Sequence, residues 1–583
     1  MNMVNLKINN VDVTVPAGST ILEAARIANI EIPTLCYMKD INAIGACRIC
    51  VVEVKGARSL VAACVYPVNE GMEVFTATPR VMNARRTTLE LILSNHNRKC
   101  LSCVRSGNCE LQKLCNEYGV DNDGKYDGDV TESEIDNSAV HMYRDNSKCI
   151  LCRRCVAVCD KNQAVSVIGA NERGFATHIG SAFEADLDET SCVSCGQCIV
   201  NCPTGALSER DDTDKVWAAL ADETKHVIVE TAPAVRAAIA EEFGNEIGTD
   251  GEGKMVASLR RLGFDGVFDT DIAADLTIIE EANEFLSRVK NGGKLPMITS
   301  CSPGWIKFCE FNYPEFLDNL STCKSPHQMF GAIAKTWYAE KNNIDPKDIF
   351  VVSVMPCTAK KFEIGRDDEN AAGVPDVDVV ITTRELARMI KRAGINFNAL
   401  PEEKFDLPLG ASTGASVIFG ATGGVMEAAL RTAVEKLTGE ELKALDFHEV
   451  RGVEGLKEAT YNVAGMDVKV AVASGLANAK ALLEKVKSGE ADYHFIEIMG
   501  CPGGCVNGGG QPIQPASVHQ TVDIKAKRAS VLYNIDKNMP LRKSHENPVL
   551  KELYAEYLGE PGGHKAHELL HTTYVKRDKF GTL

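Results

Sequence analysis

Cysteine is the residue whose number and spacing in this 583-residue sequence point most directly to chemistry. The chain has 22 cysteines, and sixteen of them lie between Cys36 and Cys202. The N-terminal segment MNMVNLKINNVDVTV alternates polar and apolar residues and has no signal-peptide core, so we expect a cytoplasmic protein with reduced thiols. Clustered spacing in such a protein favours metal ligation over disulfide bonds.

The clearest cysteine pattern is a doubled CxxCxxCxxxC run whose second copy ends in Cys202-Pro203. In two-cluster ferredoxins the fourth cysteine of each run ligates the other cluster. The pattern therefore predicts two 4Fe-4S clusters with crossed ligand sets. One set is Cys149, Cys152, Cys155 and Cys202, and the other is Cys192, Cys195, Cys198 and Cys159.

Two more groups of possible ligands precede this run. The first group is Cys36, Cys47, Cys50 and Cys64. Four thiolates from a small β-rich domain suit a 2Fe-2S cluster, and a structural zinc site is the alternative. The second group is His96, Cys100, Cys103 and Cys109. On spacing alone its histidine could ligate a metal or be an ordinary polar residue of a helix, while Cys115 is left over as a free thiol.

Four later cysteines follow apolar segments of strand length. Cys301 comes after LPMITS, Cys357 after FVVSVMP, and Cys501 and Cys505 after YHFIEIMG. Ligands of open α/β sheets bind at the carboxyl ends of strands, so these four thiols should surround one crevice. The alternative is that they are small buried hydrophobic residues, which we expect for Cys309 and Cys323.

The elements that must position these residues change character along the chain. The segments LKINN and VDVTV alternate as strands do, and Thr20 with Glu23 forms a capping box, which predicts a small strand-and-helix domain. Beyond about residue 215, apolar strands alternate with amphipathic helices, one of which ends at Gly292 and another of which begins with a capping box at 382–385. This pattern predicts an α/β domain whose sheet is covered on both faces.

Composition excludes several classes of protein. The chain is 45% apolar and 25% charged, as in globular proteins, and its length predicts several domains. A net charge of −17 would repel nucleic acid, and no apolar run approaches the length of a membrane span.

Five segments resemble the signature set of iron-only (FeFe) hydrogenases. They are TSCSPGW (299–305), MPCTAKKFE (355–363), FGATGGVMEAALR (419–431), IMGCPGGCVNGGGQP (498–512) and RKSHEN (542–547). The resemblance covers essentially the whole chain, since the N-terminal modules are similar to plant-type ferredoxin and to the electron-input subunit of complex I. It implies reversible reduction of protons to H₂ at an H-cluster, a 4Fe-4S cubane joined to a di-iron unit that carries CO, cyanide and an azadithiolate.

The resemblance also implies a multidomain α+β and α/β architecture. The expected units are a β-grasp 2Fe-2S domain (1–78), a domain with a 4Fe-4S cluster on one histidine and three cysteines (79–138), a ferredoxin-like domain with two 4Fe-4S clusters (139–209) and an α/β H-cluster domain (210–583). One 2Fe-2S cluster and three accessory 4Fe-4S clusters would carry single electrons to the H-cluster.

Residue roles at the active site follow from the same resemblance. Cys357, Cys501 and Cys505 match cubane ligands, with Cys505 bridging to the di-iron unit. Lys360 matches a donor to a cyanide ligand, Met355 and Met499 match apolar packing around the di-iron unit, and His327 stands where a glutamine is expected.

The first signature departs from the usual pair of adjacent cysteines, because it reads Cys301-Ser302. Either Ser302 is an alkoxide ligand beside a proton-relaying Cys301, or Cys301 is the ligand and a hydroxyl relays protons. Iron–sulfur chemistry prefers thiolate, which favours Cys301 as the metal ligand, whereas the register of the motif favours Ser302.

Protons need a path as well. Glu281, Glu284 and Arg288 have the spacing of one helix face. By itself this could be a solvated face with an ion pair. The resemblance implies a proton path of Glu281, Glu284, Ser321 and the relay cysteine.

The expected partners are ferredoxin and an NADH-oxidising flavoprotein, the latter within a hetero-oligomeric complex with small Fe-S subunits, for which electron bifurcation is one alternative. No GxGxxG dinucleotide fingerprint is found in the sequence, so NAD chemistry would belong to another subunit. The main alternative function is a non-catalytic electron-wiring subunit of a larger dehydrogenase. An iron–sulfur assembly protein and a hydrogen sensor are further alternatives.

Overall fold

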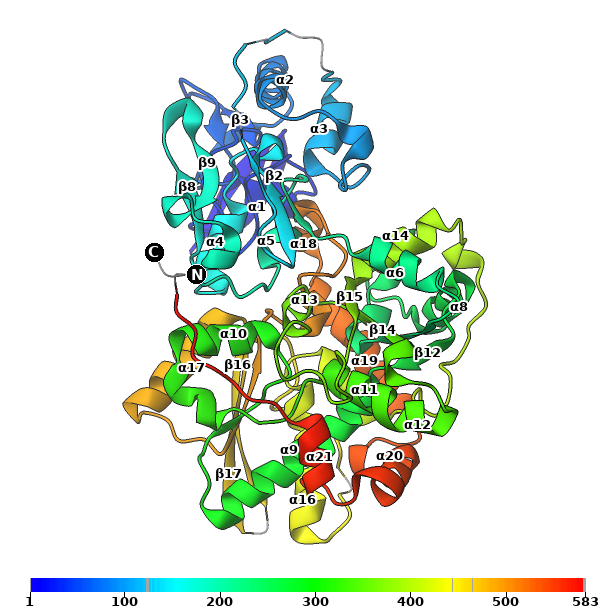
Figure 1. Cartoon of the computed structure of the whole chain (residues 1–583). Helices are drawn as coiled ribbons and strands as arrows, with labels where there is room; N and C mark the ends of the chain where they lie inside the picture. The colour runs from blue at the N-terminus through cyan, green and yellow to red at the C-terminus, as the bar shows by residue number, and fades with distance from the viewer. Residues whose placement is uncertain are drawn as a thin grey trace.

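The computed structural model describes residues 2–121, 125–126, 128–131, 133–442, 444–463 and 465–579. It is a mixed α/β multidomain structure, as expected. Small N-terminal modules, coloured blue to cyan, lie on a larger part that is coloured green to red (Figure 1). Among the helices of the described residues, none has the length and apolar character that crossing a bilayer requires.

The first module is a five-stranded sheet with the strand order β2-β1-β5-β3-β4. Its strands are β1 (Met3–Ile8), β2 (Val11–Pro16), β3 (Val51–Val54), β4 (Val61–Ala62) and β5 (Glu73–Phe75). Helix α1 (Ile21–Ile27) begins with the predicted capping box, in which the backbone N–H of Glu23 donates to Thr20 Oγ1 at 3.2 Å. The Glu23 carboxylate in turn accepts from the backbone N–H of Thr20 at 2.7 Å. This box satisfies N–H groups at the helix start that no turn of the helix can satisfy.

Two smaller modules connect this sheet to the rest of the chain. Helices α2 (Pro79–Ser94) and α3 (Glu110–Tyr118) flank the loop that carries the His96 group. The next module holds short helices α4 (Arg154–Ala157) and α5 (Gln197–Val200), each just after a CxxC pair. Its strands are β6 (Ile135–Asp136), β7 (Met142–Asp145), β8 (Ile168–Asn171), β9 (His178–Ser181) and β10 (Leu207–Glu209).

The large α/β part contains two four-stranded sheets, whereas the sequence pattern predicted a single covered sheet. The first sheet, of order β12-β11-β14-β15, is parallel throughout. The second, of order β13-β18-β17-β16, is parallel except for its edge strand β16. The strands are β11 (His226–Thr231), β12 (Gly266–Asp269), β13 (Met297–Ile298), β14 (Ile349–Met355), β15 (Val379–Thr382), β16 (Leu456–Val463), β17 (Met466–Ser474) and β18 (Phe495–Met499). Hydrophobic patterning identifies strands but not their partners, which explains the error.

Helices cover both sheets and create separate apolar cores around them. The longest is α9 (Asp271–Asn291), which ends at Gly292 in the left-handed conformation, as the sequence predicted. Others are α8 (Glu252–Leu262), α10 (Pro303–Asn312), α11 (Pro326–Ile333), α13 (Lys360–Glu363), α14 (Thr383–Arg392), α15 (Gly414–Val417), α16 (Gly424–Thr438), α17 (Leu476–Ser488), α18 (Ala516–Thr521), α19 (Ile524–Asn538), α20 (Pro548–Leu553) and α21 (His564–Leu570). Helix α14 begins with the second predicted capping box.

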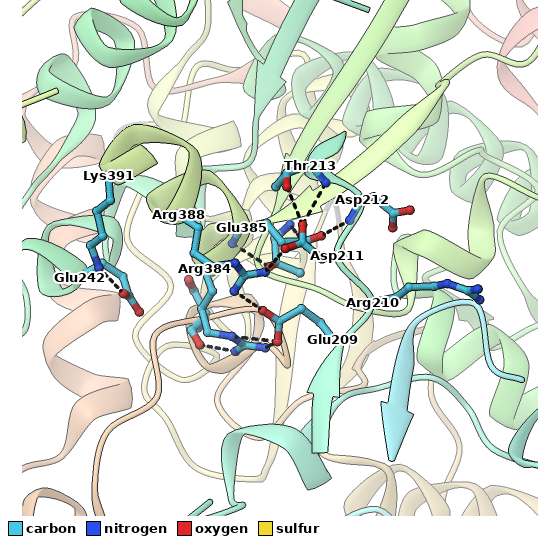
Figure 2. Close-up of polar contacts among 12 residues, drawn as sticks. Glu209, Arg210, Asp211, Asp212, Thr213, Glu242, Arg384, Glu385, Arg388 and Lys391 are labelled. Carbon is cyan, nitrogen blue, oxygen red and sulfur yellow. Dashed lines mark hydrogen bonds and ion pairs between the residues drawn. The ribbon is translucent and has the colours of Figure 1, made fainter. Parts of the chain in front are cut away.

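A buried ionic joint fixes the cysteine-rich modules to the large α/β part (Figure 2). Glu209, at the end of β10, accepts from Arg384 at 2.6 Å and from Arg388 at 2.7 Å, both on α14. Burial alone would raise the pKa of Glu209, but the two guanidinium groups hold it well below its ordinary value. Beside this cluster, Lys361 contacts both Asp212 and Glu385 at 2.5 and 2.9 Å. A buried charge that loses its partner destabilises the fold, so these contacts hold the cysteine-rich modules and the large α/β part in one relative orientation.

Candidate active site and iron–sulfur relay

The predicted crevice exists, and it lies between the two sheets. Strand β14 of the first sheet leads to Cys357, while β13 and β18 of the second lead to Cys301 and to Cys501. One pocket at these strand ends is lined by all the residues that the sequence assigned to the active-site chamber: Cys301, Ser302, His327, Met355, Cys357, Lys360, Met499, Cys501 and Cys505. The walls between them are mostly apolar and small, including Ala234 and Gly420.

Three thiols of this pocket face one another. Cys357 and Cys505 are the electrostatic neighbours of Cys501, and burial is the main cause that raises the pKa of all three. The 22 cysteines all lie in the described ranges, and none of them forms a disulfide bond there. A buried set of unpaired thiols that face one another is suited to an iron–sulfur cluster, which binds thiolates.

The adjacent residues Cys301 and Ser302 have different neighbours. Glu281 and Cys505 are among the titratable neighbours of Cys301, and burial raises the pKa of its thiol well above the ordinary value. Ser302 is the N-cap residue of α10, and its Oγ accepts from the backbone N–H of Gly500 at 3.0 Å, directly before Cys501. Cys301 therefore has both Glu281 and Cys505 as neighbours, and Ser302 lies beside the loop of Cys501.

Lys360 is held by a buried polar network that the sequence did not reveal. Its Nζ donates to Glu363 at 2.9 Å and to Ser325 at 3.1 Å, and Glu363 also contacts His327 Nε2. Burial opposes the charge of Lys360, yet Glu363 raises its pKa. Burial and Lys360 lower the pKa of His327 to about 4, so the imidazole is neutral. Glu363 stands at i+3 from Lys360 in MPCTAKKFE, which was the only sequence signal for this pair.

Two carboxylate side chains of the predicted proton path belong to helix α9. Glu281 is buried, and neither of its oxygens has a hydrogen-bond partner among the described residues. Burial, with Glu284 nearby, raises its pKa to about 8, while Ser321 lies close enough to lower it slightly. Ser321 Oγ donates to Glu284 at 3.0 Å, and Arg288 donates to the other oxygen of Glu284 at 2.5 Å. The structure thus places Glu281 next to Cys301, and Ser321 and Glu284 next to Glu281.

The eight cysteines of the doubled run form the two crossed groups. Cys202 is the electrostatic neighbour of Cys149, Cys152 and Cys155. Cys159 is the neighbour of Cys192, Cys195 and Cys198. This is the arrangement that the two-cluster pattern predicts.

The second of these groups reaches the active-site pocket. Cys195 has Cys357 and Cys501 among its electrostatic neighbours. The loops come so close that a Cβ on Gly509 would lie 2.3 Å from the carbonyl oxygen of Cys195, so only glycine fits there. The side chain of Gln197 also donates to the backbone carbonyl of Asn507 at 2.9 Å.

The two remaining groups lie in the N-terminal modules. His96 Nδ1 is buried and has no hydrogen-bond partner among the described residues, which leaves it available as a metal ligand, and burial lowers the pKa of His96 to about 4. Its companions Cys100, Cys103 and Cys109 lie in the same loop, and Cys115 is buried beside Cys109 and Cys100. Members of the first group, Cys36, Cys47, Cys50 and Cys64, hydrogen-bond one another through their side chains.

One amide joins the first group to the doubled run. Asn42 is buried, and its Nδ2 donates to the carbonyl of Cys36 at 2.8 Å and to the carbonyl of Cys152 at 2.9 Å. No sequence pattern points to Asn42, because the two cysteines it connects are more than a hundred positions apart.

Groups of buried thiols that lead one after another to a pocket lined by thiols and a lysine define an iron–sulfur redox enzyme. Comparison with known proteins gives the family. Residues 225–509 match the iron only hydrogenase large subunit, C-terminal domain, and residues 522–577 match the iron hydrogenase small subunit. Residues 1–79 match a 2Fe-2S iron-sulfur cluster binding domain, 85–123 the NADH-ubiquinone oxidoreductase-G iron-sulfur binding region, and 148–206 a 4Fe-4S dicluster domain.

Two of the similar proteins match nearly the whole length of this chain. The chain is 51% identical over 590 residues to the NADP-reducing hydrogenase subunit HndD of Solidesulfovibrio fructosivorans, covering 99% of this chain and 100% of the relative. It is 44% identical over 576 residues to iron hydrogenase 1 of Clostridium pasteurianum, covering 98% and 100%. A solved FeFe hydrogenase HydA1 variant from Chlamydomonas reinhardtii is 46% identical, covers 63% of this chain and 99% of its own, and has a TM-score of 0.56. The chain belongs to the iron-only hydrogenases, and it contains 2Fe-2S and 4Fe-4S binding domains besides the H-cluster domain.

Proposed function

We propose that this hydrogenase interconverts protons and H₂ at an H-cluster held by Cys357, Cys501 and Cys505, with Cys505 as the bridging ligand. The observation that carries the assignment is the convergence of two routes on one pocket. Cys195 of the nearest accessory group approaches from one side, and Cys301 with Glu281 lies on another. When bound, the H-cluster supplies the redox chemistry of hydrogen.

The side chains that line the pocket would bind and orient the H-cluster and would exclude water from it. Lys360, kept charged by Glu363, presents a cation to the pocket and suits an anionic cyanide ligand. Met355 and Met499 line the same chamber with apolar surface. Neutral His327 adds to the pocket wall a side chain that forms hydrogen bonds and carries no charge.

We assign roles to Cys301 and Ser302 from the residues that lie next to each of them. Ser302 takes the fourth cubane position, since its Oγ lies beside the loop of Cys501, and Cys301 relays protons toward Glu281. Glu281 can carry a proton near neutral pH, because its pKa of about 8 is close to working conditions. Ser321 and Glu284 continue the path outward.

We further propose the accessory clusters and the division of the chain. The groups of Cys36 and His96 would hold a 2Fe-2S and a 4Fe-4S cluster, and the crossed groups two 4Fe-4S clusters, in domains 1–78, 79–138, 139–209 and 210–583. Asn42 connects the first domain to the third, which supports electron entry through the 2Fe-2S cluster.

Membership of a larger complex is proposed from similarity to a relative that is named as a subunit of an NADP-reducing hydrogenase. An NADH-oxidising flavoprotein partner and ferredoxin as a second donor are proposed from the resemblance of the N-terminal modules, and a cytoplasmic location is proposed as well. Co-purification of the tagged chain from its own cells tests the complex, and a chain recovered alone would count against it.

The test of catalysis is an infrared spectrum of the protein matured with a di-iron source, in which CO and cyanide bands should appear and shift under H₂. Ser302→Cys should keep these bands and change the magnetic resonance signature of the cubane, while Cys301→Ala should keep both and abolish turnover. Absent bands, with intact accessory clusters and a control hydrogenase that matures normally, would instead favour an electron-wiring subunit.

A further inference from the structure

Glu284, the outer carboxylate of the proposed proton path, lies close to His571 in the C-terminal part of the chain. One oxygen of Glu284, the sulfur of Cys323 and a ring nitrogen of His571 all lie within 4.8 Å of one another. That separation is short enough for one water molecule to bridge the imidazole and the carboxylate. Burial keeps the pKa of the Cys323 thiol well above its ordinary value, so the thiol stays neutral.

His571 is held in place from both ring nitrogens. Nδ1 lies 2.7 Å from Thr322 Oγ1, and the backbone N–H of Thr322 donates to Glu284 at 3.1 Å. Nε2 lies 3.3 Å from Glu280, whose carboxylate accepts from Gly562 N–H at 2.8 Å. An antiparallel bridge between Cys323 and His571 fixes the backbone. The His571 side chain is only 5% exposed, so these contacts occur away from bulk water.

A second histidine connects this site to the surface. The ring of His567, on α21, stacks on His571 with centroids 4.5 Å apart and an interplanar angle of 9°. His567 is exposed to solvent. Helix α21, drawn in red, lies beside the green helix α9 that carries the carboxylates (Figure 1).

We infer that His571, with His567 at the surface, passes protons between bulk water and Glu284. His567 takes a proton from water or buffer, and a ring nitrogen of His571 receives it through a water molecule. The other ring nitrogen releases a proton through a bridging water to the Glu284 carboxylate, and the ring then returns to its starting tautomer. No electron moves and no bond other than N–H and O–H changes. The inference rests on the proposed proton path of the proposed function and adds its outer end.

Titratable side chains from two helices face His571. They are Glu280 and Glu284 of α9 and the stacked ring of His567 on α21. Burial and His571 lower the pKa of His567, so the exposed ring releases its proton readily. Such a relay uses imidazole in its usual role as a proton shuttle near neutral pH.

The test compares three single variants of the matured holoenzyme: His571→Asn, His567→Asn and, as a matched control, His564→Asn. His564 lies on the same helix with its side chain 97% exposed. Hydrogen evolution with a chemically reduced dye is measured across pH 5.5 to 8.5, with and without imidazole in the buffer. We expect His571→Asn to lower the rate at least about tenfold, most strongly at high pH where protons are scarce, and imidazole to restore it. His567→Asn should lose less, and His564→Asn nothing.

Two results would overturn the inference. One is a His571→Asn rate equal to that of the His564→Asn control. The other is a loss that is uniform across pH and is not rescued by imidazole, which would show a purely structural role. Glu284→Gln separates this failure from that of the proposed path. If Glu284→Gln is inactive while His571→Asn is normal, only the histidine inference is wrong, and if Glu284→Gln is fully active the path itself is wrong.

Discussion

Replacing Glu281 by glutamine should stop proton delivery and, at alkaline pH, stabilise the fold. The carboxyl is buried without a hydrogen-bond partner among the described residues, and its pKa is raised from 4.5 to about 8. At about 1.36 kcal/mol per pKa unit, ionising it costs the folded protein about 5 kcal/mol more than the unfolded chain. Between pH 4.5 and 8 the unfolded chain has lost this proton while the folded protein keeps it, so the free energy of unfolding falls as pH rises.

Glutamine cannot ionise, so the variant escapes this loss. The difference in unfolding free energy between Glu281→Gln and wild type should therefore shift in favour of the variant by about 3 kcal/mol between pH 6 and pH 8.5. For a domain of this size that is several degrees in the midpoint of thermal unfolding. Hydrogen evolution should fall by about a hundredfold or more at every pH.

The assay is anaerobic thermal unfolding of both proteins at the two pH values, with Glu284→Gln as control. Glu284 is paired with Arg288, so its replacement should give no such gain at high pH. The reasoning is refuted if the difference between Glu281→Gln and wild type is the same at pH 6 and pH 8.5.

Three further substitutions test other parts of the structure. Glu209→Gln leaves Arg384 and Arg388 without their buried partner, and it should lower the free energy of unfolding by about 3 kcal/mol in urea titrations, with an unchanged midpoint counting against the joint. Asn42→Leu removes two buried hydrogen bonds, and it should cost about 2 kcal/mol and slow electron passage from the 2Fe-2S cluster to the dicluster, as followed by rapid-freeze magnetic resonance; equal rates would contradict the bridge. His327→Gln removes a buried imidazole whose pKa is lowered to about 4, so the variant should lose less stability than wild type as pH falls from 6.5 toward 4, and parallel losses in urea midpoints at pH 7 and 5 would refute this.

Local chemistry was predictable from the sequence wherever a short motif carries the information. The capping boxes at Thr20 and Thr382, the end of α9 at Gly292 and the burial of Cys309 and Cys323 are all confirmed. Each of these depends on residues a few positions apart.

Features that depend on distant segments were not predictable. The two-sheet division follows from strand pairing, which periodicity does not encode. Glu230 is buried 4.0 Å from the pocket residue His327 and has no hydrogen-bond partner among the described residues. It lies in an ordinary apolar strand, and nothing in HVIVETAP marks it as a neighbour of the pocket. His571 contacts Thr322 across 249 positions, a separation at which no spacing rule applies.

The C-terminal segment has a consequence for how the enzyme is assembled. Residues 522–577 match a family described as a small subunit, yet here they continue the same polypeptide as the large-subunit domain. A covalently tethered segment docks at an effective concentration on the order of millimolar, independent of how much protein the cell makes. The segment that carries His571 therefore reaches its place beside Cys323 with one-to-one stoichiometry in every molecule, without a separate association step.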